Sequence, residues 1–202
     1  MLNLDFVQQV VHATCKYKFV YYMMYSNGTL VDKFKQFTND PIVKSICYRF
    51  EVQLSYDGDK HHKAMRGDNS ASILETAHML VDAGFSINFK ATLVFDKIGF
   101  FVDSWKSYER LHDEFGSTVR YCPTLDTMNA GLTSEIVDDF YKQSIEVAKC
   151  EYKFIAKHGH PLISWYDPYH MNKQSCRLDY HAAIDTDGSI YLCHGCFYSS
   201  SK

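Results

Sequence analysis

The chain has 202 residues, enough for one sizeable domain or for a domain with a small appendage. Hydrophobic residues make up 46% and charged residues 22%, which is ordinary for a soluble globular protein. The formal net charge of −3 does not indicate a basic surface, which argues against nucleic acid as a main partner. No apolar run is long enough to span a membrane, and the N-terminus lacks the pattern of a signal peptide. We therefore expect a cytoplasmic protein whose seven cysteines bind metal or stay as free thiols, rather than forming disulfides.

The N-terminal third predicts a helix, a strand and a second helix. Asn3 is a suitable N-cap for the first helix, which has no strand before it. Residues 19–25 are apolar or aromatic throughout, which predicts a strand buried on both faces of a covered parallel sheet. Residues 30–37 read as a short helix that ends at Asp40 and Pro41.

The middle of the chain predicts two further strands around a clear helix. Residues 50–55 read as a strand, and residues 60–69 as a polar loop. An apolar stripe that includes Ile73, Ala77 and Leu80 predicts the helix, with Gly84 at its C-terminal end. Apolar and polar residues then alternate over residues 87–93, which predicts a third strand.

A further helix, strand and helix follow. The next helix contains Trp105 and stops at Gly116, and residues 118–122 read as a fourth strand that ends at Pro123. A long helix runs from about residue 134 to at least 148. Its side chains expected to face inward are Ile136, Val137, Phe140, Tyr141 and Val147.

This alternation of strands and helices predicts an α/β fold with a parallel sheet, either open or wound into a barrel. In both arrangements functional residues gather at the C-terminal ends of the strands. Here those ends are residues 26–28, 55–58, 95–96 and 122–123. We place a domain boundary after residue 157, between a domain of residues 1–157 and a cysteine-containing region of residues 158–202.

The C-terminal region is predicted to contain a β-hairpin around the Asp-Gly turn at residues 185–188. Eleven residues separate Cys176 from Gly188, and four separate Gly188 from Cys193, with Cys196 close behind. Thiolates at these three cysteines suit an iron–sulfur cluster or zinc.

A closed zinc site at these cysteines needs a fourth ligand, which His181 or His194 would supply. The remaining interpretation is three unligated thiols.

Two strand ends and the cysteine hairpin together resemble the radical S-adenosylmethionine enzymes that carry a C-terminal SPASM-type cluster domain. Residues 26–30, Ser-Asn-Gly-Thr-Leu, look like the end of one of their strands. Residues 52–58, which end in Ser-Tyr-Asp-Gly and are followed by Arg66, look like another. The cysteine–glycine–cysteine spacing is similar to the opening of the SPASM pattern. The order of the three motifs agrees with that family over nearly the whole chain.

The resemblance implies a partial (β/α) parallel barrel that binds S-adenosylmethionine at its strand ends. Ser55 and Asp57 would offer a hydroxyl and a carboxylate to the ribose or amino groups, and Asn27 and Gly28 a close backbone approach. Arg66 would pair with a carboxylate or hold its loop in place. The alternative interpretation is that these residues form strand-terminating turns and a solvated basic loop.

The family also implies an auxiliary iron–sulfur cluster at Cys176, Cys193 and Cys196, and a peptide or protein substrate. Two family motifs are missing from this sequence: the CxxxCxxC loop for the cluster that cleaves S-adenosylmethionine, and the glycine-glycine-glutamate-proline strand end. We therefore expect an N-terminally truncated fragment that depends on a missing N-terminal half. The alternatives are a non-catalytic metal- or peptide-binding remnant that keeps the barrel as a scaffold, and an inert product of a broken gene.

Overall fold

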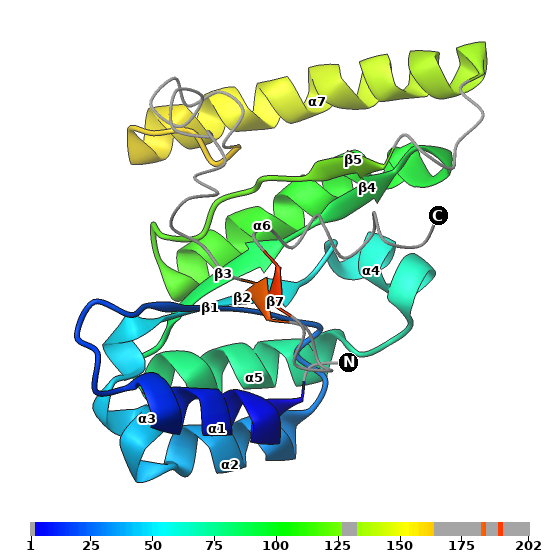
Figure 1. Cartoon of the computed structure of the whole chain (residues 1–202). Coiled ribbons are helices and arrows are strands. Elements are labelled where there is room, and N and C mark those ends of the chain that lie inside the picture. The colour runs from blue at the N-terminus through cyan, green and yellow to red at the C-terminus, as the bar shows by residue number, and fades with distance from the viewer. Residues whose placement is uncertain (1–2, 127–132, 164–182, 185–189, 192–202) are drawn as a thin grey trace.

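The computed structural model describes residues 3–126, 133–163, 183–184 and 190–191, and helices and strands alternate through most of it (Figure 1). The strands are β1 (Tyr22–Ser26), β2 (Phe50–Ser55), β3 (Ser86–Lys90), β4 (Thr92–Val94), β5 (Thr124–Asp126), β6 (Ala183–Ile184) and β7 (Ile190–Tyr191). The helices are α1 (Leu4–Thr14), α2 (Val31–Asn39), α3 (Pro41–Ser45), α4 (Asp59–Arg66), α5 (Ser70–Asp82), α6 (Phe101–Phe115) and α7 (Ser134–His158), with short 3-10 helices η1 (Cys47–Arg49) and η2 (Phe95–Phe100).

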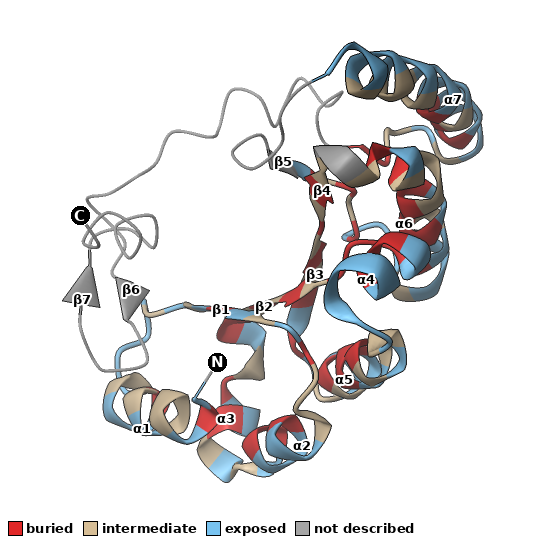
Figure 2. Ribbon diagram, turned by 90° about the vertical axis from the view of Figure 1, so that its right-hand side faces the viewer, coloured by how far each residue is buried: buried red, intermediate tan, exposed pale blue. Residues whose placement is uncertain are grey.

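The strands of the N-terminal part are parallel, as the sequence predicts. β1, β2 and β3 form one sheet in that order, with Met24 opposite Val52 and Val52 opposite Ile87. β4 and β5 form a second parallel pair, and β3 leads directly into β4 through Ala91. Figure 2 shows that the strands from β1 to β5 follow an open arc with the helices on its outer side. The α/β class with parallel strands is confirmed, but the described strands do not close into a barrel.

The core lies between the outer face of this arc and the helices. On β2 the residues Phe50, Val52 and Leu54 are buried, while Glu51, Gln53 and Ser55 between them are only half-buried and face the concave side. Fully burying a side chain of this size stabilises a fold by roughly 1.5–3 kcal/mol. The helices contribute the buried side chains of Phe34, Phe37, Ile73, Ala77 and Leu80. The alternating burial along β2 and the buried stripe of α5 both agree with their sequence patterns.

The prediction that residues 19–25 are buried on both faces is wrong. Met24 is buried, but Tyr21 is 74% and Met23 is 54% exposed. β1 lies at the edge of the three-stranded sheet, and only its outer face is covered by described helices (Figure 2). Because apolar side chains occupy both faces of this strand, the sequence could not distinguish the covered face from the uncovered one.

Two further strand predictions need correction. Residues 87–93 form two strands rather than one, because the chain changes partner at Ala91: the carbonyl of Lys90 accepts from Tyr56 N (2.9 Å), whereas the carbonyl of Ala91 accepts from Thr124 N (2.9 Å). The expected strand at residues 118–122 is a single bridge between Tyr121 and Ile163. The regular strand β5 starts after the proline at position 123. Proline lacks an N–H for the ladder and is tolerated at a strand's beginning.

The predicted polar loop at residues 60–69 is mostly helix α4. His61 and His62 belong to this helix and are both fully buried, so its inward face consists of histidines. A hydropathy pattern treats histidine as polar and therefore does not reveal this face. The long helix α7 is confirmed and extends to His158, where Gly159 ends it with a left-handed φ of +76°. Val137 and Tyr141 were expected to face inward but are exposed on α7, whereas Val147 is buried as expected.

The predicted C-terminal hairpin is confirmed in its pairing, because β6 and β7 are antiparallel with Ala183 opposite Tyr191. Its turn and the three cysteines at positions 176, 193 and 196 lie outside the described residues. The proposed division after residue 157 falls one residue before the end of α7 and stays a prediction. Within the described part of the chain, no helix combines the length and apolar character that crossing a membrane requires.

Candidate functional site

A buried carboxylate marks the C-terminal end of β2. The side chain of Asp57 is 1% exposed, and its Oδ2 lies 2.5 Å from Nε of Arg66, in the last turn of α4. Its Oδ1 accepts a hydrogen bond of 2.8 Å from the backbone N–H of Thr92, at the start of β4. Asp57 therefore joins three segments: the end of β2, the end of the helix α4 that follows it, and the more distant β3–β4 junction.

His62 forms the inner wall of this arrangement. The backbone N–H of Asp57 donates to Nδ1 of His62 over 3.3 Å, and Nε2 of His62 lies 2.6 Å from Oδ1 of Asn69. Nδ1 of His62 also lies 3.6 Å from Oδ2 of Asp57, so the imidazole contacts both the backbone and the carboxylate of that residue. The imidazole fixes the loop between α4 and α5 against the β2 end.

The electrostatics keep Asp57 ionised. Burial alone would raise the pKa of this carboxyl, but its contacts with His62, Arg66 and the Thr92 N–H, together with the Arg66 charge, lower the pKa to about 2. The prediction that Arg66 pairs with a carboxylate or holds its loop is consistent with this ion pair. Arg66 belongs to helix α4 rather than to a loop, and its side chain is 39% exposed.

Helix α6 clamps the backbone of the same strand end. Oγ of Ser104 donates to the carbonyl of Asp57 (2.5 Å), and the hydroxyl of Tyr108 donates to the carbonyl of Tyr56 (2.7 Å). Gly58 has a φ of +94°, and a Cβ there would lie 2.6 Å from Cα of Ser104. Glycine is required at this point because the α6 backbone approaches too closely for any side chain.

Asn27 and Gly28, at the end of β1, form a self-contained turn. Oδ1 of the exposed Asn27 accepts from the backbone N–H (3.4 Å) and hydroxyl (3.1 Å) of Thr29. Gly28 has a φ of +68°, and its carbonyl accepts from Oγ1 of Thr76 (2.8 Å). These contacts agree with the interpretation of the pair as a strand-terminating turn.

Ser55 and Lys90 lie side by side on the concave side of the arc. They are Cα partners in the β2–β3 pairing, and both alternate with residues buried under the helices. Nζ of Lys90 donates to the carbonyl of Cys122 over 3.1 Å. The sequence reasoning missed Lys90, although its position in the alternating segment was a usable signal. The sequence reasoning also missed the hydrogen bond from the backbone N–H of Thr92 to Asp57, which no sequence pattern indicates.

The predicted metal ligands Cys176, Cys193 and Cys196 cannot be placed, because they lie outside the described residues. Within the described ranges, the cysteines do not gather into a metal-binding group; the one group of three potential ligands there is His112, Asp113 and His158. It lies away from the strand ends and belongs to a different part of the molecule.

The parallel strands in an open arc with helices on the outer side are similar in fold to solved structures of anSMEcpe. The chain is similar to anSMEcpe with bound AdoMet and Kp18Cys peptide, with a TM-score of 0.62 and 19% identity over 95% of this chain and 57% of that one. Native anSMEcpe with bound AdoMet gives 0.61 and 18%, over 95% and 56%. The complex with AdoMet and Cp18Cys peptide gives 0.63 and 17%, over 95% and 57%.

This chain therefore spans a little more than half the length of anSMEcpe. No protein-family model matches the sequence, and no curated protein matches it either. At this level of identity the likeness concerns the fold.

Proposed function

We propose that this chain is part of a radical S-adenosylmethionine enzyme, with a partial (β/α) barrel that binds S-adenosylmethionine at its strand ends and acts on a peptide or protein. The observation that carries the proposal is the ion pair between the buried Asp57 and the partly exposed Arg66 at the end of β2. It lies at the strand ends, where α/β folds bind ligands, and the fold is that of an enzyme whose structures contain AdoMet.

Arg66 is the residue best suited to touch the cofactor. Its side chain is 39% exposed, and its two hydrogen bonds to Asp57 use two of its five N–H donors. The other donors suit an anion such as the methionine carboxylate of S-adenosylmethionine. Ser55, half-buried on the concave side, would add a hydroxyl. Asn27 and Gly28 would let the cofactor approach the backbone closely.

Asp57 has a different role in this proposal from the one that the sequence suggested. Its oxygens are already engaged by Arg66 and Thr92, so it would orient the guanidinium rather than contact a ribose or amino group. S-adenosylmethionine supplies radical chemistry when an iron–sulfur cluster is present. The described residues contribute binding and orientation, and we propose that the cluster loop comes from a segment outside this sequence.

Cys176, Cys193 and Cys196 remain our proposed ligands for an auxiliary iron–sulfur cluster, with zinc as the alternative, and we propose a cytoplasmic protein. A second candidate function is a non-catalytic peptide-binding scaffold. The exposed side chains of Met23 and Tyr25 favour it, because they face the concave side beside Gln53, where an extended peptide could lie against the edge strand β1.

Binding of S-adenosylmethionine to the purified chain tests the first proposal, measured by equilibrium dialysis with the labelled cofactor. The variant R66A should bind about 10–100-fold more weakly, as expected for a lost charge-assisted hydrogen bond of about 1.5–3 kcal/mol. K63A is the matched control, because Lys63 lies on the same helix and pairs with the exposed Asp68. Equal binding by R66A and the parent chain would contradict the proposal.

Catalysis needs a separate test. The chain would be combined anaerobically with a polypeptide that carries a CxxxCxxC cluster loop, and 5′-deoxyadenosine would be measured after reduction. Formation of this product only when both parts are present supports the enzyme. Cofactor binding without product favours the scaffold.

A further inference from the structure

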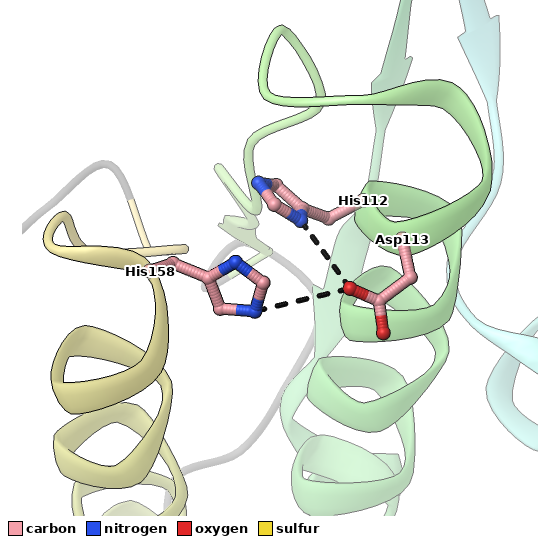
Figure 3. A group of neighbouring side chains, drawn as sticks. All are labelled: His112, Asp113 and His158. Carbon is pink, nitrogen blue, oxygen red and sulfur yellow. Dashed lines mark ion pairs between the residues drawn. The ribbon is translucent and has the colours of Figure 1, made fainter.

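Two histidines and an aspartate come together where the C-terminal ends of α6 and α7 meet. His112 and Asp113 belong to α6, and His158 is the last residue of α7. Nδ1 of His112 and Nε2 of His158 each lie 3.8 Å from the same atom, Oδ1 of Asp113. Figure 3 shows both imidazole rings turned toward this oxygen. One potential ligand atom from each residue lies within 4.8 Å of the others.

The histidines of this group are buried without hydrogen-bond partners. His112 is 6% exposed, and neither of its ring nitrogens has a hydrogen-bond partner in the described part of the chain. Nε2 of His158 is also buried and without such a partner there. A buried polar atom that lacks a hydrogen bond destabilises the folded state, so such atoms in a folded protein call for an explanation such as a bound ion.

We propose that His112, Asp113 and His158 bind a divalent transition-metal ion of the zinc class. Two imidazoles and one carboxylate are ligands that zinc accepts, and a site with three protein ligands keeps a further position for water. At bond lengths of about 2.0–2.2 Å, ligand atoms around a tetrahedral ion lie roughly 3.4 Å apart. The two separations to Asp113 are a few tenths of an ångström wider, and the ligand atoms of the whole group lie within 4.8 Å of one another, so side-chain rotation has to draw the three residues together around the ion.

The surroundings of the site favour a cation. The C-terminal end of a helix carries a partial negative charge, and two such ends meet here. Lys157 is the competing cation, with Nζ 3.6 Å from Oδ2 of Asp113, the oxygen that does not face the histidines. Asp113 is 51% exposed and leaves the ion an entry path.

His160 and Phe154 lie next to the three proposed ligands but are not ligands themselves. Nη1 of Arg120 lies 2.8 Å from Nδ1 of His160, which holds that ring at the rim. The rings of His112 and Phe154 are 4.9 Å apart at 82°, and this packing fixes the imidazole's orientation. Both helices run back from the strand ends, so the metal would tie α7 to α6 at the rim opposite the proposed cofactor site.

The test is zinc binding to a chain in which the three C-terminal cysteines are replaced, C176S/C193S/C196S, so that the thiolates of the proposed cluster site cannot supply the signal. Titration with zinc chloride against a chromogenic chelator should show one ion per chain. D113N and H158A in the same background should bind at least about 10-fold more weakly, since even residues that only support a ligand change affinity by that factor.

H78A is the matched control. His78 also pairs with a carboxylate, with Nε2 2.6 Å from Oε1 of Glu114, but no third potential ligand joins them among the residues that the structure describes. H78A should bind zinc as the parent does, and zinc should raise the thermal unfolding temperature of the parent and of H78A but not of D113N. D113N changes a half-exposed residue without changing its shape, so it should fold. No zinc binding by the chain without the three C-terminal cysteines, or equal binding by D113N, would overturn the proposal.

Discussion

Arg66 and Asp57 join the end of helix α4 to the end of strand β2 through a contact of 2.5 Å between Nε and Oδ2. The carboxylate is buried and the guanidinium is partly exposed, so one end of the pair is fixed in the fold and the other faces outward. A charge held in this way is oriented before any ligand arrives, which reduces the entropy lost on binding. The same pair also ties α4 to the sheet, and its removal should therefore affect stability as well as binding.

Replacing Asp57 with asparagine should lower the free energy of unfolding by about 1–3 kcal/mol, the range for losing a hydrogen-bonded charge from a buried position. Arg66 is partly solvated, so the loss should stay below that of a fully buried pair. Urea denaturation measures the effect. D68N is the control: Asp68 pairs with Lys63 on the surface and should change stability by less than about 0.5 kcal/mol. Equal values for the two variants would show that the buried pair adds nothing.

The stability of the chain should fall in acid through Asp57. Its pKa is about 2 in the folded protein, against about 4 in an unfolded chain. The ionised carboxylate therefore contributes fully above about pH 4, and this contribution, about 2 kcal/mol, disappears as the pH falls toward 2. Urea midpoints measured between pH 6 and pH 2.5 should drop more steeply for the parent than for D57N. Parallel curves would contradict the assignment.

Gly58 should tolerate alanine far less well than Gly116 does. Both have nearly the same positive φ, +94° and +90°, so both alanine variants carry the strain of that conformation, about 1–3 kcal/mol. A Cβ at Gly58 would also meet Cα of Ser104 at 2.6 Å, whereas a Cβ at Gly116 meets nothing within 4 Å. G58A should therefore be less stable than G116A by about 1–3 kcal/mol in urea denaturation, the usual cost of overpacking. Similar losses would mean that α6 moves away freely.

The sequence correctly predicts those helices and strands whose apolar and polar residues separate onto two distinct faces. Strand β2 and helix α5 are confirmed because each has one buried face and one polar face. The prediction for β1 is wrong because the strand is apolar on both faces while only one face is covered. The prediction of a polar loop at α4 is wrong because the buried face of this helix is made of His61 and His62. In both cases the missing fact is which side of the segment the rest of the chain covers.

The candidate site divides in the same way. Asp57 and Arg66 lie within one short motif, so their pairing could be anticipated from the sequence. The contact of Asp57 with the N–H of Thr92 depends on where β3 gives way to β4, which no local pattern records. His112 and His158 lie on different helices, and only the packing of α7 against α6 brings them together.

That packing depends on a buried carboxylate, Glu151 of α7, and its removal gives the last prediction. Oε2 of Glu151 accepts from Nε1 of Trp105 over 2.7 Å, and Oε1 accepts from the backbone N–H of Ile163 over 3.0 Å. In E151L both donors stay buried without an acceptor, at about 1–3 kcal/mol each, so the free energy of unfolding should fall by about 2–5 kcal/mol. E151Q keeps one acceptor and should lose about half as much.

Tryptophan fluorescence during urea denaturation reports this directly, because Trp105 is the residue that loses its partner. E146L is the control on the same helix, since Glu146 is exposed and pairs only with Lys149 in the described structure. It should change stability by less than about 0.5 kcal/mol. If E151L were as stable as the parent, apolar packing by leucine would outweigh the two unpaired donors, and α7 would be held to α6 by its hydrophobic contacts alone.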